Sequence, residues 1–211
     1  MLIAGRRGRG FTIIEIMIAL GIAGLLMALG LPAFRDFLAN SKIRSTAETL
    51  QAGLQLARSE AINRNRTVQF LLFDDTDYDA GEVGTVTANA SGPNYVIRVQ
   101  DPVTLVFTQI DWRNGYEGSG QANTAPPTTT IAATYPTMAL GGTANIITFK
   151  GLGGTLLGGT ANFDVTNASA GACTTSGTPS PIRCLRVQVT VSGQIRMCDP
   201  AVASTDTRYC S

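Results

Sequence analysis

The 211-residue sequence contains no histidine. This absence excludes Ser-His-Asp and Cys-His catalysis, and it excludes any metal site with imidazole ligands. Charge is also scarce, since Asp, Glu, Lys and Arg make up only 15% of the residues and the net charge is +1. Any nucleic-acid binding would therefore depend on a local cluster of basic residues, because the protein has almost no net positive charge. We expect a protein that is not an enzyme and has no cofactor.

Cysteine occurs only near the C-terminus, at Cys173, Cys184, Cys198 and Cys210. No pair has the C-x-x-C spacing typical of zinc sites, and the acidic turn 75–81 lacks the glycine and the final glutamate of a calcium-binding EF-hand loop, so no metal site is expected. Outside the cytoplasm an even set of cysteines indicates two disulfides. Three connectivities are open. We favour Cys173–Cys184 with Cys198–Cys210, because each closes a short loop.

No charged side chain occurs between Ile16 and Phe34. As a helix, this run is long enough to cross about 30 Å of hydrocarbon. Arg6, Arg7 and Arg9 precede it, and the positive-inside rule keeps that end in the cytoplasm. An ordinary cleaved signal peptide and a plain signal anchor are the alternatives. The run is longer than the usual core of a cleaved signal, in which a carboxylate would also be unusual.

Apolar side chains continue at steps of three and four from Phe34 to Ala61. This spacing predicts that one helix extends from Phe11 to about Asn65, with an amphipathic second half. Pro32 removes one backbone hydrogen bond inside this helix and is expected to kink or loosen it.

Short β-rich segments follow the helix and predict a sheet. They are residues 67–73, 95–100, 105–107, 146–149, 163–165, 185–191 and 195–197. A three-residue turn at 192–194 would pair Val191 with Ile195 and Thr190 with Arg196. Residues 115–145 are rich in Gly, Thr, Ala and Pro, and we expect an irregular, exposed insertion. The fold class expected is α+β.

The segment Gly8-Arg9-Gly10-Phe11-Thr12-Ile13-Ile14-Glu15 resembles the prepilin-peptidase site of type IV pilins and type II secretion pseudopilins. The resemblance implies cleavage after Gly10 and methylation of the new N-terminus at Phe11. It also implies that Glu15 pairs with the N-terminal amine of a neighbouring subunit and so guides assembly. At Pro32 it implies local melting of the helix when subunits pack in a filament.

Three further segments are similar to one pilin subgroup, which contains the GspH pseudopilins and the FimT and FimU minor pilins. They are residues 56–65, 147–149 and 191–196. The resemblance implies a type IV pilin fold, in which a long hydrophobic N-terminal helix packs on an antiparallel β-sheet domain. The expected function is that of a minor pilin, incorporated into or priming a type IV pilus. The alternative is a GspH-type minor pseudopilin of a type II secretion system, and the N-terminus cannot separate the two.

This reading divides the chain into four parts. We expect a leader peptide at 1–10, a transmembrane or filament-core half helix at 11–33, an amphipathic half helix at 34–65 and a β-rich periplasmic domain at 66–211. The expected partners are the prepilin peptidase, the inner membrane and other pilins or pseudopilins. The mature chain would then move from the inner membrane into a pilus or pseudopilus.

The turn Gly193-Gln194-Ile195-Arg196 raises the question of DNA binding. In the DNA-uptake branch of the subgroup, this position reads Gly-Arg-x-Arg and its arginines contact DNA. Here Gln194 replaces the first arginine and Arg196 remains. Arg183, Arg186 and Arg208 could join it in a patch that binds double-stranded DNA phosphates without reading sequence. The alternative is a solvated strand face with scattered arginines.

Overall fold

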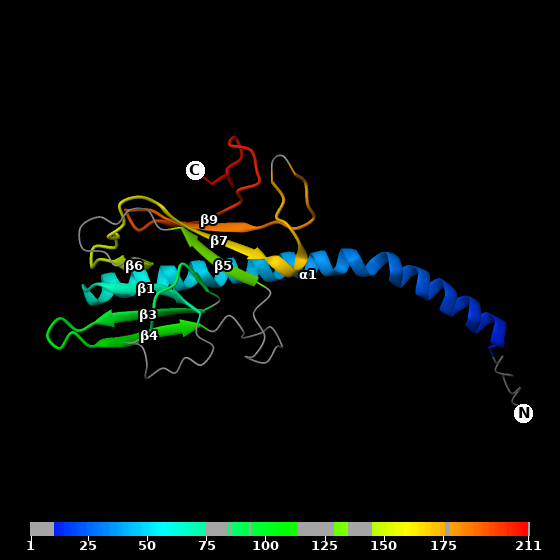
Figure 1. Ribbon diagram of the computed structural model, residues 1–211, viewed down its shortest axis with the longest axis horizontal. Helices are drawn as coiled ribbons and strands as arrows, with labels where there is room; N and C mark the ends of the chain where they lie inside the picture. The colour runs from blue at the N-terminus through cyan, green and yellow to red at the C-terminus, as the bar shows by residue number, and fades with distance from the viewer. Residues whose placement is uncertain are drawn as a thin grey trace, which may run out of the picture. The chain divides into compact units, whose positions relative to one another are not determined.

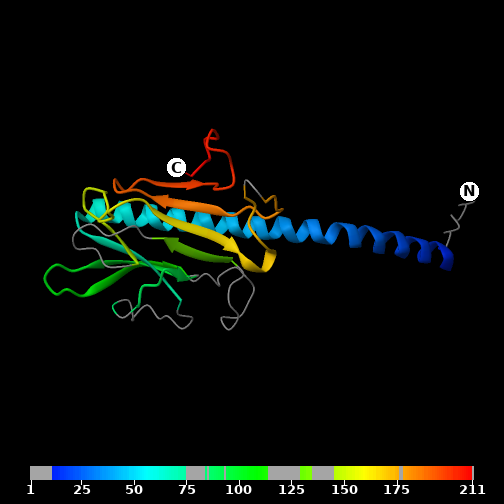
Figure 2. The same ribbon diagram turned by 45° about the horizontal axis from the view of Figure 1, so that its top comes forward.

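The computed structural model describes residues 11–74, 84, 86–92, 94–113, 129–134, 145–175 and 178–210. Gly10 and the acidic turn 75–81 lie outside the described residues. The described chain is α+β, with one long helix and two antiparallel sheets (Figures 1 and 2). It divides into two compact units, Met1–Leu38 and Ala39–Ser211, here called the N-terminal unit and the C-terminal unit.

Helix α1 spans Ile13–Arg64, close to the range that the apolar spacing predicts. It ends where Asn65 adopts a left-handed backbone with φ 49°. The Arg66 N–H then donates to the Ala61 carbonyl at 3.1 Å, as in a helix C-cap of the Schellman type. The helix runs through Pro32 without a break. Local melting at Pro32 on subunit packing stays a prediction.

In the N-terminal unit, the described part of α1 has no buried side chain. By length and composition, α1 is apolar and long enough to cross a membrane. A signal sequence passes the same test of length and composition. So large an exposed apolar surface is not stable in water and calls for lipid or another protein as cover.

The first sheet has the strand order β4-β3-β1-β6 and is antiparallel throughout. Its strands are β1 (Val68–Phe73), β3 (Asn94–Gln100), β4 (Phe107–Arg113) and β6 (Ile146–Phe149). The expected strand at 105–107 is wrong, because β4 begins only at Phe107. Leu105 lies in the preceding turn with φ 57°, a conformation that cannot continue a strand.

The second sheet has the order β2-β5-β7-β8-β9 and is also antiparallel. Its strands are β2 (Ser91–Gly92), β5 (Thr129–Thr134), β7 (Ala161–Asn167), β8 (Leu185–Val189) and β9 (Ile195–Cys198), and a 3-10 helix, η2 (Ala168–Ala170), follows β7. Strand β5 contradicts the expected irregular insertion for residues 129–134, while 115–128 and 135–144 lie outside the described residues. Its Ile131 is buried and all six of its residues pair with β7, from Asn162 to Asn167, so tertiary pairing decides the structure of this Thr- and Ala-rich segment.

The core of the C-terminal unit forms where one stripe of α1 meets side chains from both sheets. The stripe consists of small and aliphatic residues: Ala39, Ile43, Ala47, Leu50, Gly53, Leu54, Ala57 and Ala61. Phe70 stacks on Tyr95 and meets Phe163 edge-on, with ring centroids 5.0 and 6.1 Å apart. Burial, with a smaller contribution from Asp111, raises the pKa of Tyr95 to about 12. The hydroxyl therefore stays neutral inside the core.

The β8–β9 hairpin differs from the expected register by two residues. Val189 pairs with Ile195, and Gln188 pairs with Arg196. Strand β8 ends earlier than expected because Thr190 closes the turn, with its N–H donating to the Gln194 carbonyl at 3.0 Å and its carbonyl accepting from Gly193 at 2.9 Å. A shift of two keeps every side chain on its expected face.

Candidate functional site

The first described residues form an N-terminal cap on α1. The Glu15 N–H donates to the Thr12 hydroxyl at 3.3 Å, and the Ile16 N–H donates to the Thr12 carbonyl at the same distance. Thr12 and Glu15 have the spacing of a capping box, Thr-x-x-Glu, which satisfies backbone donors at a helix start. The sequence analysis missed this role of Thr12, although the spacing ahead of the apolar run is a signal for it.

Glu15 is exposed, and none of the described basic side chains forms an ion pair with it. Phe11 is 79% exposed. A carboxylate in an apolar segment costs several kcal/mol once it is buried, unless a cation neutralises it. Among the described residues, the chain supplies no cation that would neutralise this carboxylate once the segment is buried.

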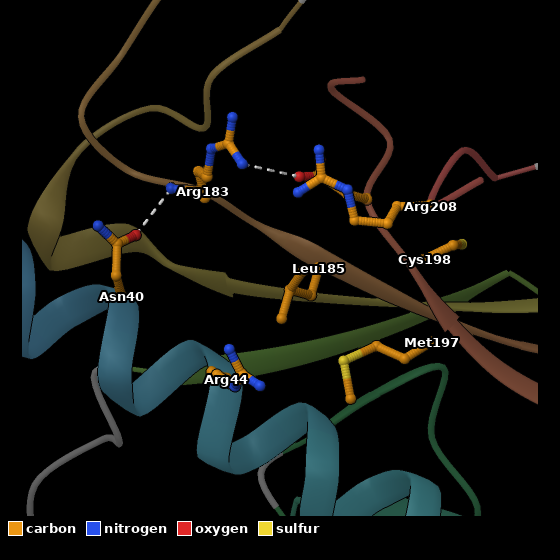
Figure 3. A pocket seen from close by; sticks show the side chains of 8 residues that line it. Asn40, Arg44, Arg183, Leu185, Met197, Cys198 and Arg208 are labelled. Carbon is orange, nitrogen blue, oxygen red and sulfur yellow. Dashed lines mark hydrogen bonds and ion pairs between the residues drawn. The ribbon is translucent and has the colours of Figure 1, made fainter. Parts of the chain in front are cut away.

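At the C-terminal side of the molecule, a groove of about 410 Å³ lies against α1 (Figure 3). Three arginines line it, together with apolar side chains and one carboxylate. The lining residues are Asn40, Arg44, Arg183, Leu185, Met197, Cys198, Asp199 and Arg208. The structure therefore brings Arg183 and Arg208 of the expected patch to one groove and adds Arg44, which the sequence did not indicate. Arg44 lies one helical turn beyond Asn40, on the same face of α1.

A hydrogen bond to Asn40 fixes the backbone of Arg183, while much of the Arg183 side chain is exposed. Its N–H donates to the Asn40 amide oxygen at 2.8 Å, and the Asn40 amide donates in turn to the Pro181 carbonyl at 2.9 Å. The guanidinium lies 3.5 Å from the carboxylate of Asp199, which is almost completely buried. With 57% of its side chain exposed, Arg183 can still reach a ligand from solvent.

Arg208 forms two hydrogen bonds to Asp206, at 3.1 and 2.8 Å. The Arg208 side chain and backbone N–H together lower the pKa of Asp206 to about 2. The same pairing raises the pKa of Arg208. Both groups are therefore charged over the whole physiological range, and each largely neutralises the other.

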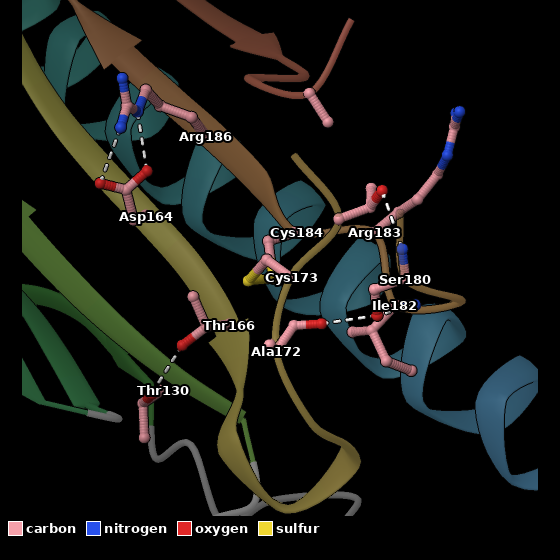
Figure 4. Close-up of a disulfide and its surroundings, with 12 residues drawn as sticks. Thr130, Asp164, Thr166, Ala172, Cys173, Ser180, Ile182, Arg183, Cys184 and Arg186 are labelled. Atoms are coloured by element: carbon pink, nitrogen blue, oxygen red, sulfur yellow. Dashed lines mark hydrogen bonds and ion pairs between the residues drawn. A yellow bond between two sulfur atoms is a disulfide. The ribbon is translucent and has the colours of Figure 1, made fainter. Parts of the chain in front are cut away.

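Arg186 and Arg196 do not line the groove. Arg186 forms a two-point pair with Asp164 across strands β8 and β7, at 2.7 and 3.1 Å (Figure 4). Arg196 donates to the Gln188 side chain at 3.2 Å and to the Tyr209 carbonyl at 3.0 Å. The predicted four-arginine patch is thus split, and two of its members support the sheet and the C-terminal segment.

Two disulfides frame the segments that carry the groove arginines. They join Cys173 to Cys184 and Cys198 to Cys210, the pairing favoured from the sequence. The first is next to Arg183, as Figure 4 shows, and the second closes the loop that contains Arg208. Closing loops of this length stabilises the fold by roughly 3 kcal/mol each in the chain-entropy model.

The chain matches two known sequence families. Residues 46–193 match the family described as type II transport protein GspH, and residues 5–31 match the prokaryotic N-terminal methylation motif.

Individual relatives are more distant. A fimbrial protein of Pseudomonas aeruginosa is 28% identical over 88 residues, which is 42% of this chain and 57% of the relative. The chain thus spans just over half the length of that relative. The type IV minor pilin FimU of Pseudomonas aeruginosa aligns over 81% of this chain and 95% of its own, with 19% identity and a TM-score of 0.47. The minor pseudopilin EpsH from the type 2 secretion system of Vibrio cholerae aligns over 76% and 99%, with 13% identity and a TM-score of 0.42.

Proposed function

From the finding that the chain belongs to the GspH family, we propose that it is a minor pilin, a low-copy subunit of a type IV pilus that primes or joins the filament. This family consists of pilin-like structural proteins rather than enzymes, in agreement with the absence of histidine. The observation that carries the proposal is the N-terminal methylation motif, which is followed by a helix with no buried side chain in its unit.

The processing steps follow from this motif. A prepilin peptidase removes residues 1–10 and methylates Phe11, and the apolar half of α1 anchors the chain in the inner membrane with the β-rich domain in the periplasm. On assembly, Glu15 pairs with the amine of a neighbouring Phe11, and other pilins cover the apolar helix. Apolar burial and one ion pair then replace the contacts with lipid.

The alternative is a minor pseudopilin of a type II secretion system, and the family name favours it. The curated fimbrial relatives favour the pilus. Deleting the gene and scoring piliation and protein secretion in the same strain decides between them. A minor pilin predicts a loss of surface pili with normal secretion, whereas a pseudopilin predicts the reverse.

A second candidate function is the binding of double-stranded DNA, and two exposed guanidiniums at one groove, Arg183 and Arg208, support it. Asp199 and Asp206 lie against these two arginines, and Asp164 neutralises Arg186. Three carboxylates therefore offset most of the charge of the four arginines of the predicted patch. We therefore expect weak binding that depends strongly on salt, because only phosphate contacts contribute.

The test uses the full chain in detergent micelles and a short DNA duplex at low and physiological salt. Replacing both Arg183 and Arg208 by alanine should weaken binding about tenfold or more. The control is Arg64→Ala, which removes an arginine paired with Glu60 elsewhere on α1. Equal loss in the control, or binding that does not respond to salt, would contradict a site in the groove.

A further inference from the structure

Exposed large apolar side chains are not spread evenly over the C-terminal unit. Among its described residues there are seven, and all except Tyr209 lie in the last turns of α1, the β3–β4 turn, the segment after β6 or the β8–β9 turn. These six, here called the α1-end surface, are Ile62, Val103, Leu105, Val106, Leu152 and Val191. A concentration of exposed apolar side chains on one side of a protein marks an interaction site.

Contacts between three loops and the helix end bring these residues together. The Arg58 guanidinium donates to the Gly153 carbonyl at 3.0 Å, and the Thr155 N–H donates to the Val191 carbonyl at 2.9 Å. On the other side, Arg66 lies 3.8 Å from the Asp101 carboxylate. Figures 1 and 2 both place the β3–β4 turn, the segment after β6 and the β8–β9 turn at the end of α1 that is followed by β1.

Hydrogen bonds within the β3–β4 turn define its conformation, in which the apolar side chains are exposed to solvent. The Asp101 carboxylate accepts from the N–H groups of Val103 and Thr104 at 2.8 and 2.9 Å. The Leu105 N–H donates to the Asp101 carbonyl at 2.9 Å, and the Gln100 amide donates to the Leu105 carbonyl at 3.0 Å. Leu105 adopts a left-handed backbone, which a leucine rarely does. A turn tied by these hydrogen bonds that exposes Val103 by 87% can bind a partner with a smaller ordering cost than an unconstrained loop.

Basic side chains border the α1-end surface. Arg64 and Arg66 are about half exposed, and Lys150 is exposed next to Leu152. The acidic groups at this border, Glu60 and Asp101, face Arg64 and Arg66. Three basic groups against two acidic groups leave this border with a net excess of positive charge, so an acidic partner complements it better than a second copy of this chain does.

We propose that the α1-end surface docks onto a different pilin-type chain of the same filament, through an apolar patch on that chain bordered by acidic side chains. This inference rests on the proposed function and identifies the surface by which the subunit contacts its neighbour. The apolar side chains supply the contact area, and the basic border selects the partner.

The test places a photoreactive benzophenone amino acid at Val103 or at Leu152 of the full chain, in the cells that produce it. Ser204, an exposed residue of the Cys198–Cys210 loop, serves as the control position. After irradiation, sheared filaments are collected and the adducts are identified by mass spectrometry. We expect an adduct with a chain that carries its own N-terminal methylation motif, at least fivefold above the yield from Ser204.

Leu105→Asn sharpens the test, because asparagine tolerates the left-handed backbone at this position while removing the apolar side chain. It should lower the adduct yield from Val103 at least fivefold without lowering the melting temperature. Leu105→Met, which keeps the apolar surface, should retain the yield.

An adduct with lipid or with a second copy of this chain would overturn the proposal. So would a yield equal to that from Ser204 while the chain is present in the filaments. Absence of the chain from the filaments would overturn the proposed function itself, and the docking surface with it.

Discussion

The N-terminal helical segment and the disulfide-framed C-terminal segment differ in whether their polar and apolar groups find partners within the chain. Between Ile13 and Leu38 large apolar side chains are exposed, and Glu15 has no ion-pair partner among the described residues. The segment from Cys173 to Cys210 contains two disulfides, and three of its arginines pair with aspartates, two within the segment and one with Asp164 of β7. Within the described residues, the first segment leaves its apolar side chains and its carboxylate without a partner, whereas the second forms its main polar contacts inside the chain.

This difference separates assembly from stability. Changes in the N-terminal segment should act on incorporation into a filament and leave the folded domain unchanged. Changes in the C-terminal segment should act on the free energy of unfolding first. Each prediction below tests one side of this division.

The largest effect is expected for Glu15→Ala. Under the proposed pairing of Glu15 with the amine of a neighbouring Phe11, removing the carboxylate should lower incorporation into filaments at least tenfold. The melting temperature of the full chain should not change. Quantifying the chain in sheared filaments and in membranes checks this, with Glu48→Ala as the control, since Glu48 is a carboxylate of the same helix that pairs with Arg44. A similar loss in both variants would contradict a specific role for Glu15.

Opening the second disulfide with Cys198→Ser and Cys210→Ser should lower the free energy of unfolding by roughly 3 kcal/mol. The unfolded chain gains the entropy of an open loop, and the pairs at Asp199 and Arg208 lose their frame. Chemical denaturation of the full chain in detergent measures the change. Ser204→Ala, inside the same loop, is the control and should have almost no effect. Processing at Gly10 should continue in the double variant.

Arg186→Ala should cost about 1 kcal/mol, because it breaks a two-point pair that is only partly exposed. The comparison variant is Arg44→Ala, whose pair with Glu48 is more than half exposed and should contribute a few tenths of a kcal/mol. Denaturation of the two variants in parallel tests whether arginines of the sheet stabilise the fold more than arginines on the helix surface.

Acid should loosen the C-terminal segment by a small amount. The pKa of Asp206 is about 2 in the folded chain, below its ordinary value of 3.8. The stabilising contribution of this carboxylate is therefore present above about pH 4 and is lost as the pH falls through about 2. Protection of the Arg208 and Tyr209 amides, measured against the intrinsic exchange rate at each pH, should fall over this range in the native chain. Asp206→Asn should show fast exchange at these residues already at pH 6, with little further change on acidification.

Much of this architecture could be predicted from local pattern. Strand β6 and the start of β8 fall where alternation places them, and α1 begins and ends within two residues of its expected bounds. Strand β5 could not be found, because its Thr- and Ala-rich sequence resembles a loop and only pairing with β7 makes it a strand. The start of β4 was missed for a related reason, since the apolar residues Leu105 and Val106 belong to an exposed turn.

The candidate sites show the same limit. Gly10, Phe11 and Glu15 are adjacent in sequence, so a motif finds them. The groove joins Arg44 of the helix to Arg183 and Arg208 of the C-terminal segment, which only the folded chain brings together. Counting arginines near one hairpin also could not reveal that Arg186 and Arg196 are engaged in internal hydrogen bonds.

Mass spectrometry of the chain isolated from sheared filaments tests the central claim most directly. The account predicts a chain that begins at Phe11 and carries one added methyl group at its N-terminus. A chain that retains residues 1–10, that lacks the methyl group or that is found only in membranes would contradict it.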